Sequence, residues 1–196
     1  MRHGSRFLAG FVTTALLVTS CSNGGNPTIA QTPVSSIFPG VGVPKVEHPL
    51  DIAAAEKNPC GVLSSEEIES LGEKIRNSST DYSPIGGLSC FWHLEGAGLI
   101  ATVTPSAGHS VRGLTDVYAM RAYGVHPAFT PITISQYPAI ISDTSSSSCY
   151  IMIGVRDDKT YGVHGDFGSE SPNISEPCVA TQKIGEFLIA RLKQLQ

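Results

Sequence analysis

The sequence predicts an α+β fold: an antiparallel sheet packed on one face by an N-terminal helix and a long C-terminal helix, and held by two disulfides. The first observation behind this prediction is the order of elements, which is a helix, two strands, a helix, several strands and a long helix. The second is a content of 20 Gly and 13 Pro, which is too high for a plain helical bundle and fits a mixed fold with many turns. The third is an even number of cysteines in the domain.

The amino terminus has the features of a lipoprotein signal peptide over residues 1–20. A short basic segment is followed by the mostly apolar run 7–18 and by small residues before Cys21. The pattern Val18-Thr19-Ser20-Cys21 resembles the bacterial lipobox, which implies diacylglyceryl transfer to the Cys21 sulfur and cleavage before this residue. The alternative is a transmembrane anchor, but 12 apolar residues fall short of the ~20 that a membrane-spanning helix needs.

Cleavage would change the charge of the protein. Residues 1–20 contain Arg2 and Arg6, so their removal takes the formal charge from −4 to −6 and leaves 176 residues. An acidic chain with no basic patch is a poor nucleic-acid binder, and nucleic acid is therefore excluded as a partner. The expected contact with the membrane is through the lipid on Cys21.

The mature chain is expected to divide into a tether and one domain. Residues 21–49 contain the lipidated cysteine, then five Pro, four Gly and almost no charge, which predicts a flexible tether. Residues 50–196 are expected to form the extracytoplasmic α+β domain. Such a length is enough for one core that buries roughly two-thirds of the unfolded surface.

The first helix of the domain has a complete start signal. Ser64 is expected to be its N-cap, Glu67 follows three residues later, and Leu63 and Ile68 are placed to form a hydrophobic staple. Gly72 can end this helix. The helix dipole explains the carboxylates of Glu66, Glu67 and Glu69 better than an acidic binding site does.

Strand signals occupy the middle of the domain. Residues 90–94 and 99–104 predict a hairpin with a Gly-containing turn, and residues 114–123 predict a short surface helix. Further strands are expected at 132–134, 139–141, 149–156 and 160–167. Alternation along the first strand places Trp92 and His93 on opposite faces.

The end of the chain predicts the long helix. Pro177 suits its first position, because proline at that place sacrifices no helical hydrogen bond. An apolar stripe follows, with an arginine stem along it. Its members are Ile184, Phe187, Leu188, Arg191, Leu192 and Leu195.

Four cysteines remain if Cys21 carries lipid, and an exported domain with four cysteines is expected to form two disulfides. Three connectivities are possible. Placement favours Cys60 with Cys90 and Cys149 with Cys178, which would join each terminal helix to the sheet. A metal site is the alternative, but no pair has the close spacing of zinc ligands.

Several of these residues together resemble a known family. They are the segment 59–64, Cys90-Phe91-Trp92, Tyr137-Pro138-Ala139, and the cysteines Cys149 and Cys178. The combination is similar to a domain of unknown function in uncharacterised lipoproteins of mycobacterial and other actinobacterial cell envelopes. This resemblance covers about residues 59–195. It implies a location, a fold and two disulfides, and it implies no activity.

Candidate ligand-site residues are few. The tetrapeptide Tyr-Gly-Val-His occurs at 123–126 and again at 161–164, and Asp166 follows the second copy. If the two copies met in space, His126, His164 and Asp166 could bind a metal or act as acid and base. Coincidence in Gly-rich turns is the alternative. No nucleophile elbow and no phosphate loop is present, and neither a catalytic residue nor a cofactor is expected.

We expect a non-enzymatic binding or interaction module of the cell envelope, anchored through Cys21 on the extracytoplasmic face of the cell membrane, with an envelope ligand or partner protein. One alternative is a lipid carrier, with an apolar cavity between the sheet and the terminal helix. A second alternative is a hydrolase that uses the His and Asp residues. The strand faces 99–103 and 151–155 distinguish the first two, because a carrier would leave one of them lining a void.

Overall fold

The computed structural model describes residues 39–83, 87–103, 112–121, 123–124 and 128–196. The predicted signal peptide, Cys21 and His126 lie outside these residues. Within the described ranges, no helix combines the length and the apolar character that a membrane span requires.

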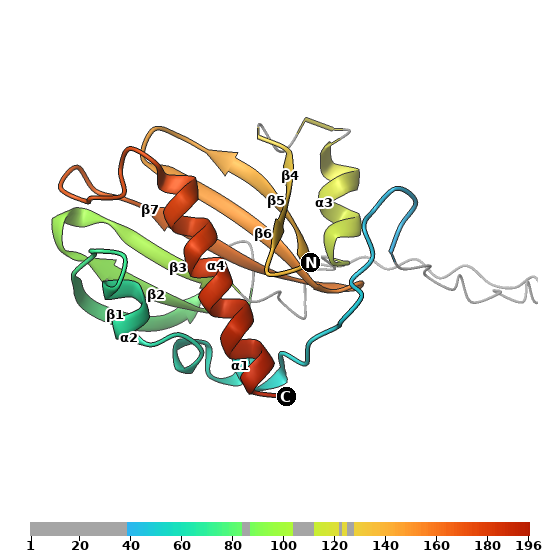
Figure 1. Ribbon diagram of the computed structural model, residues 1–196, viewed down its shortest axis with the longest axis horizontal. Coiled ribbons are helices and arrows are strands. Elements are labelled where there is room, and N and C mark those ends of the chain that lie inside the picture. The colour runs from blue at the N-terminus through green and yellow to red at the C-terminus, as the bar shows by residue number, and fades with distance from the viewer. Residues whose placement is uncertain (1–38, 84–86, 104–111, 122, 125–127) are drawn as a thin grey trace, which may run out of the picture. The chain divides into compact units, whose positions relative to one another are not determined.

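The domain is built on one antiparallel sheet of seven strands in the order β1-β2-β3-β7-β6-β5-β4, as Figure 1 shows. Two meanders make up this sheet, β1 to β3 and β4 to β7, and the pairing of β3 with β7 joins them. The predicted α+β class is confirmed. The strands are β1 (Ile75–Tyr82), β2 (Leu88–Leu94), β3 (Leu99–Val103), β4 (Thr130–Ile134), β5 (Tyr137–Thr144), β6 (Ser148–Arg156) and β7 (Lys159–Asp166). The helices are α1 (Ala53–Lys57), α2 (Ser65–Glu69), α3 (Leu114–Arg121) and α4 (Pro177–Gln194), with short 3-10 turns η1 (Pro59–Gly61) and η2 (Glu95–Ala97).

The long helix α4 covers one face of the sheet, across which it runs diagonally in Figure 1. Pro177 occupies its first turn, as the sequence predicts. Ile184 and Leu188 of α4 are fully buried in one cluster with Ile151 and Ile153 of β6. Apolar side chains thus fill the space between α4 and the sheet, and their burial is the main stabilising contribution. The buried positions of α4 are Pro177, Ala180, Thr181, Ile184, Gly185, Leu188, Ile189 and Leu192.

The other face of the sheet is covered in part by α3. Leu114 and Val117 of this helix are buried in a second cluster with Ile140 of β5 and Met152 of β6. Gly154 of β6 allows this approach, because a β-carbon there would lie 2.9 Å from a methyl group of Leu114. The sheet therefore has its main core on the α4 face and a smaller one on the opposite face.

The predicted capping box of α2 is present and also connects this helix to α4. The Glu67 backbone N–H donates to Ser64 Oγ at 3.3 Å, and the Ser64 N–H donates to Glu67 Oε2 at 2.8 Å. The other carboxylate oxygen of Glu67 accepts a hydrogen bond from Arg191 Nε at 2.8 Å. The carboxylate of Glu67 thus caps the N-terminus of α2 with one oxygen and joins α2 to the C-terminal helix with the other.

Both predicted disulfides are confirmed. Cys60 of η1 is bonded to Cys90 of β2, and Cys149 of β6 is bonded to Cys178 of α4. The bridges close segments with sequence separations of 30 and 29 residues. Each bridge therefore fixes one end of the chain to a central strand.

Residues 39–49, which the sequence assigns to the tether, lie along the domain. The N–H of Val46 donates to Asp157 Oδ1 at 2.8 Å, and the Tyr137 hydroxyl donates to the carbonyl of His48 at 2.8 Å. Val46 is buried, as is Leu50 at the end of this segment. Hydrogen bonds and apolar contacts order this stretch despite its content of Pro and Gly.

The edge strand β1 was not expected from the sequence. Its segment Ile-Arg-Asn-Ser-Ser-Thr-Asp-Tyr is almost entirely exposed and lacks the apolar alternation of a half-buried strand. Pairing with β2 over the whole length of the segment makes it a strand. Tertiary context has therefore overridden local propensity in β1.

Candidate functional site

The sheet face opposite α4 carries a hollow beside the part that α3 covers. It has a volume of about 320 Å³. The floor of the hollow is formed by every second side chain of β3, namely Leu99, Ala101 and Val103. The remaining lining residues are Ser83, Phe91, Asp143, Tyr150 and His164.

The hollow follows from one row of directly opposed residues across the sheet. Ala101 stands in this row between larger side chains of the neighbouring strands, Phe91 of β2 and His164 of β7. Because adjacent strands are about 4.8 Å apart, Phe91 and His164 are separated by roughly 10 Å at the backbone. The methyl group of Ala101 is much smaller than the rings of Phe91 and His164 on either side of it, so space remains between the two rings. The whole row is Ser79, Phe91, Ala101, His164, Tyr150 and Asp143.

Tyr150 forms the wall between the hollow and the α3 cluster. Its side chain packs against the α3 cluster and also lines the hollow. The phenol end of the ring lies over Gly162, where a β-carbon would meet its hydroxyl oxygen. Burial raises the pKa of Tyr150 to about 12, so this wall carries no charge at physiological pH.

His164 stands beside Tyr150 in an edge-on contact, with ring centroids 5.9 Å apart. Burial lowers the pKa of His164, and the carboxylates of Asp166 and Asp143 partly oppose this shift. The imidazole is consequently neutral at pH 7, and each ring nitrogen can act as a donor or an acceptor according to the tautomer.

The structure places two of the three predicted ligand-site residues. His164 and Asp166 lie on one face of β7, two residues apart, while His126 is outside the described residues. No hydrogen bond or ion pair joins His164 to Asp166 among the described residues. Asp166 is exposed and accepts a hydrogen bond from Ser147 Oγ at 3.4 Å.

The described parts of the repeated tetrapeptide differ in structure. Residues 161–164 belong to β7, where Tyr161 and Val163 are buried on the α4 side and Gly162 and His164 lie on the side of the hollow. The start of the first copy, Tyr123-Gly124, is an exposed turn after α3. The described residues Tyr123-Gly124 thus differ in conformation from Tyr161-Gly162 of the second copy.

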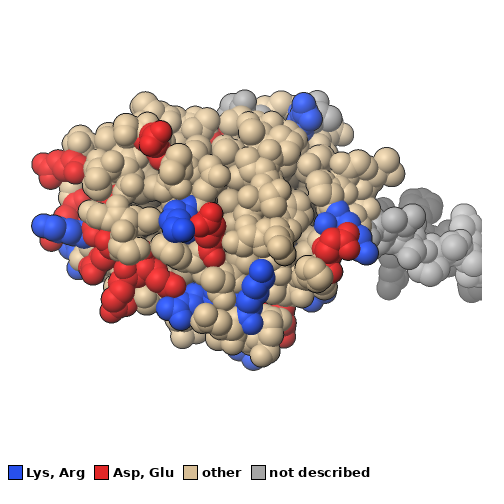
Figure 2. Space-filling view, in the orientation of Figure 1, with Lys and Arg blue, Asp and Glu red and all other residues tan. Residues whose placement is uncertain are grey.

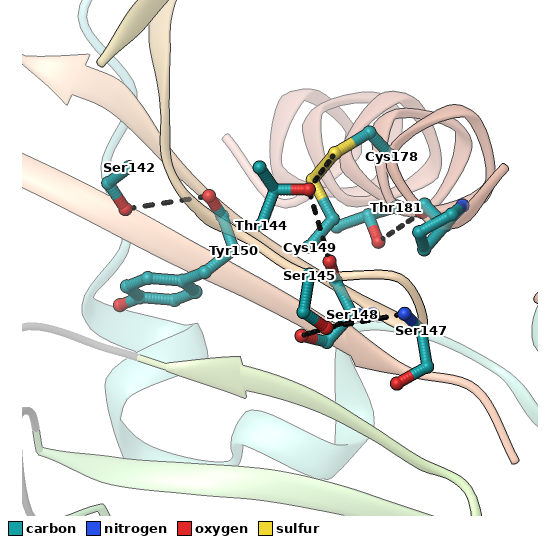
Figure 3. Close-up of a disulfide and its surroundings, with 10 residues drawn as sticks. Ser142, Thr144, Ser145, Ser147, Ser148, Cys149, Tyr150, Cys178 and Thr181 are labelled. Atoms are coloured by element: carbon teal, nitrogen blue, oxygen red, sulfur yellow. Dashed lines mark hydrogen bonds between the residues drawn. A yellow bond between two sulfur atoms is a disulfide. The ribbon is translucent and has the colours of Figure 1, made fainter. Parts of the chain in front are cut away.

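The run of four serines forms the turn between β5 and β6, beside the disulfide of Cys149 and Cys178 (Figure 3). Ser145 Oγ lies 2.8 Å from Ser148 Oγ, and it accepts hydrogen bonds from the N–H groups of Ser147 and Ser148. These bonds close the hairpin, and turn formation accounts for the run of serines without a catalytic role.

Charged side chains are unevenly distributed on the face that carries α4. Acidic groups gather toward the end where α2 lies, and much of the remaining surface in this view is uncharged (Figure 2). Glu66 is fully exposed in the first turn of α2, and hydrogen bonds from its own backbone and from Ser64 lower its pKa. Glu66 therefore belongs to a helix start. Within the described ranges, no group of three His, Cys, Asp or Glu side chains is arranged to hold a metal ion.

Sequence reasoning identified the strand face of Leu99, Ala101 and Val103, and also His164, but it missed the other half of the residues that line the hollow. Phe91, Tyr150 and Asp143 belong to strands whose register determines which of them meet, and register is not readable from one strand alone. One signal was present. Four of the five residues 99–103 are apolar and they occupy both faces of the strand, whereas a strand with one solvated face alternates apolar and polar residues.

One family model covers most of the chain. A family model described as "Protein of unknown function (DUF3558)" matches residues 16–191. No curated protein matches the chain, and no solved structure does. Any chemistry must therefore be inferred from the residues themselves.

Proposed function

The chain belongs to the DUF3558 family of proteins of unknown function, and we propose that it is a lipoprotein whose domain binds an envelope component without catalysing a reaction. Cys21 carries the lipid in this proposal and holds the domain at the extracytoplasmic face of the cell membrane. The basic, apolar and small-residue pattern of residues 1–20 supports the anchor. The resemblance to lipoproteins of actinobacterial envelopes supports the same location.

The hollow over β3 is the binding site in this proposal. A concave, mostly apolar site with a few polar groups at its edge is the usual form of a ligand site. The observation that carries the proposal is the position of Ala101 between Phe91 and His164 in one row of the sheet. Central strands position these residues, so the shape of the site does not depend on a flexible loop.

Binding is favoured over the two alternatives by the placement of particular residues. A carrier with its cavity between the sheet and α4 is disfavoured because Ile151, Ile153 and Val155 are fully buried against that helix. The other strand face, of Leu99, Ala101 and Val103, does line a hollow, but on the opposite side of the sheet and with a volume of only about 320 Å³, which suits a small molecule better than a long acyl chain. Hydrolysis by an acid–base pair is disfavoured because Asp166 is exposed and bonded to Ser147 rather than to His164.

The site is tested by photocrosslinking in the membrane-anchored full chain. A photoreactive phenylalanine analogue at Phe91, in the wall of the hollow, should form an adduct of one defined mass in intact cells. The matched control carries the same analogue at Val179, which is 61% exposed on α4. Filling the hollow with Ala101→Leu should abolish the Phe91 adduct.

Two results would contradict the proposed site. One is an adduct that forms equally from Val179. The other is an adduct at Phe91 that persists when Ala101→Leu fills the hollow in a protein with unchanged circular dichroism. In either case the residues over β3 would not be the binding surface.

The anchor is tested separately by Cys21→Ser. The parent chain should partition into the detergent phase of a Triton X-114 separation, and the variant should move to the aqueous phase if its leader is cleaved or remain as a larger precursor. Partition and mass that are the same for both proteins would show that Cys21 carries no lipid.

A further inference from the structure

We propose that the hollow over β3 selects a small organic cation with an apolar body. This inference rests on the proposed function, because it names the chemistry of the ligand for the same site. Three features of the described residues support it: the lining of the hollow, the signs of the charges around it, and its size.

The lining provides apolar contact and aromatic rings. Leu99, Ala101 and Val103 form the floor, and Phe91 and Tyr150 stand on either side of it. Aromatic rings attract cations through the negative potential of their faces, in addition to the apolar area that they bury. An apolar group with a positive charge uses both properties, whereas an anion of the same shape gains the apolar contact but is not attracted to the ring faces.

The charges at the edge of the hollow are carboxylates. Asp143 lines the hollow at one end of the row that contains Ala101 and His164. Asp166 follows two residues after His164 on β7, directly opposite Leu99 of β3. Both carboxylates raise the pKa of His164 and so partly offset the effect of its burial. No lysine or arginine is among the lining residues.

The described cations of strands β2, β3, β5, β6 and β7 are already paired. Strands β2, β3 and β5 contain no lysine or arginine. Arg156 of β6 is bonded to Asp158 at 2.9 Å, and Lys159 of β7 is bonded to Glu56 at 2.5 Å. Neither of them lines the hollow. The carboxylates of the hollow thus have no described lysine or arginine of these strands as a partner, and a bound cation would supply one.

The size favours a small molecule. A volume of about 320 Å³ is at the lower end of the 300–1,000 Å³ range that is typical of ligand sites. A concave site of this size holds a compact cation, and it offers no extended groove for a peptide strand or a long acyl chain.

His164 makes the selection dependent on pH. The groups that face it are Asp166 of its own strand, Asp143 of β5, and the unionised Tyr150 of β6, while β3 contributes Ala101. A neutral imidazole leaves the two carboxylates uncompensated. Protonation would place a positive charge beside them and should weaken cation binding as the pH falls.

The test compares three probes of similar shape and different charge: benzyltrimethylammonium, benzyl alcohol and benzenesulfonate. Binding to the full chain, isolated from membranes and placed in nanodiscs, is followed by the methyl signal of Ala101. The methyl signal of Ala139, which is buried elsewhere in the sheet, is the internal control. A fourth probe, Nα-acetyl-lysine amide, represents the side chain of a partner protein.

The expected result is a shift of the Ala101 signal, with the dissociation constant of the ammonium probe about tenfold lower than that of benzyl alcohol. Asp143→Asn and Asp166→Asn should each raise that constant about threefold, and lowering the pH from 7.5 to 5.5 should raise it further. Glu69→Gln, which removes one carboxylate from exposed α2, should leave it unchanged.

Equal binding of the three probes, or a preference for benzenesulfonate, would overturn the cation inference and leave the hollow as a binding site. An Ala101 signal that none of the probes shifts would overturn both proposals. Tighter binding of the lysine probe than of benzyltrimethylammonium would overturn the small-molecule assignment, because it would identify the side chain of a protein as the ligand.

Discussion

Tyr150 lies over Gly162 so closely that a β-carbon at Gly162 would be 2.5 Å from its hydroxyl oxygen. The two residues belong to adjacent strands, and Met152 rather than Tyr150 is directly opposite Gly162. Tyr150 therefore leans along its strand to occupy the space of a missing side chain. This arrangement sets the position of the wall between the hollow and the α3 cluster.

Gly162→Ala should move Tyr150 and lower the free energy of unfolding by about 1–3 kcal/mol, since the new methyl group overpacks a filled space. Chemical denaturation measures this change. In a Tyr150→Phe background the loss of unfolding free energy should be smaller, because the hydroxyl oxygen that would lie closest to the new methyl group is absent. Equal costs in both backgrounds would show that the Tyr150 hydroxyl is not what the methyl group displaces.

His164 should titrate below the usual histidine pKa of ~6.5, because burial disfavours the imidazolium. Asp166→Asn and Asp143→Asn should each lower the pKa of His164 further, since both carboxylates stabilise the charged form. Titration of the ring proton signals by NMR measures these values. A pKa that rises in either variant would contradict the arrangement around the hollow.

The same titration predicts how stability depends on pH. Because the folded-state pKa of His164 is below the unfolded value, the unfolded chain binds more protons between the two values. The part of the unfolding free energy that depends on a neutral His164 is complete above pH ~6.5, and it is lost as the pH falls toward the folded-state pKa. His164→Gln should flatten this part of the curve of unfolding free energy against pH, and an unchanged slope would contradict it.

Removal of either disulfide should destabilise the domain by about 3–4 kcal/mol in the chain-entropy model, since each closes a loop of similar length. Cys60→Ala with Cys90→Ala removes one bridge, and Cys149→Ala with Cys178→Ala removes the other. Thermal and denaturant unfolding measure both losses. A double variant as stable as the parent would show that its bridge contributes nothing to stability.

Ser64→Ala should cost about 1 kcal/mol, because it removes the side-chain acceptor of the α2 capping box. Glu67→Gln removes the charge that faces Arg191, and it should cost less than 1 kcal/mol because this ion pair is partly exposed. Urea unfolding of the two variants measures these costs. A larger loss in Glu67→Gln than in Ser64→Ala would show that the ion pair, rather than the cap, holds α2.

The starts of α2 and α4 were predictable from the sequence because each rests on a local pattern, whereas the fold class and the disulfide partners were inferred from the order of the elements and the placement of the cysteines. Ser64 and Glu67 are three residues apart, and Pro177 marks the first turn of α4 by itself. The strand β1 was not predictable, because its polar residues become a strand only by pairing with β2. The contacts of Val46 and His48 were also hidden, since their partners are more than 80 positions away.

The candidate site was predictable in part. His164 and Asp166 were identified from their side-chain chemistry. Ala101 has no functional group, and it shapes the hollow only because its neighbours in the sheet, Phe91 and His164, are larger. The row that joins Phe91, Ala101, His164 and Tyr150 depends on three strand registers together. A one-residue slip in any of them would send a side chain to the other face.

The hollow belongs to neither meander of the sheet. Phe91 and Ala101 come from the first, and His164, Tyr150 and Asp143 come from the second, so the site exists only after β3 has paired with β7. A ligand that contacts both halves binds the joined state and not the separated halves. Its binding free energy would therefore be added to the stability of this junction, and occupancy of the hollow would make the two halves of the domain harder to pull apart.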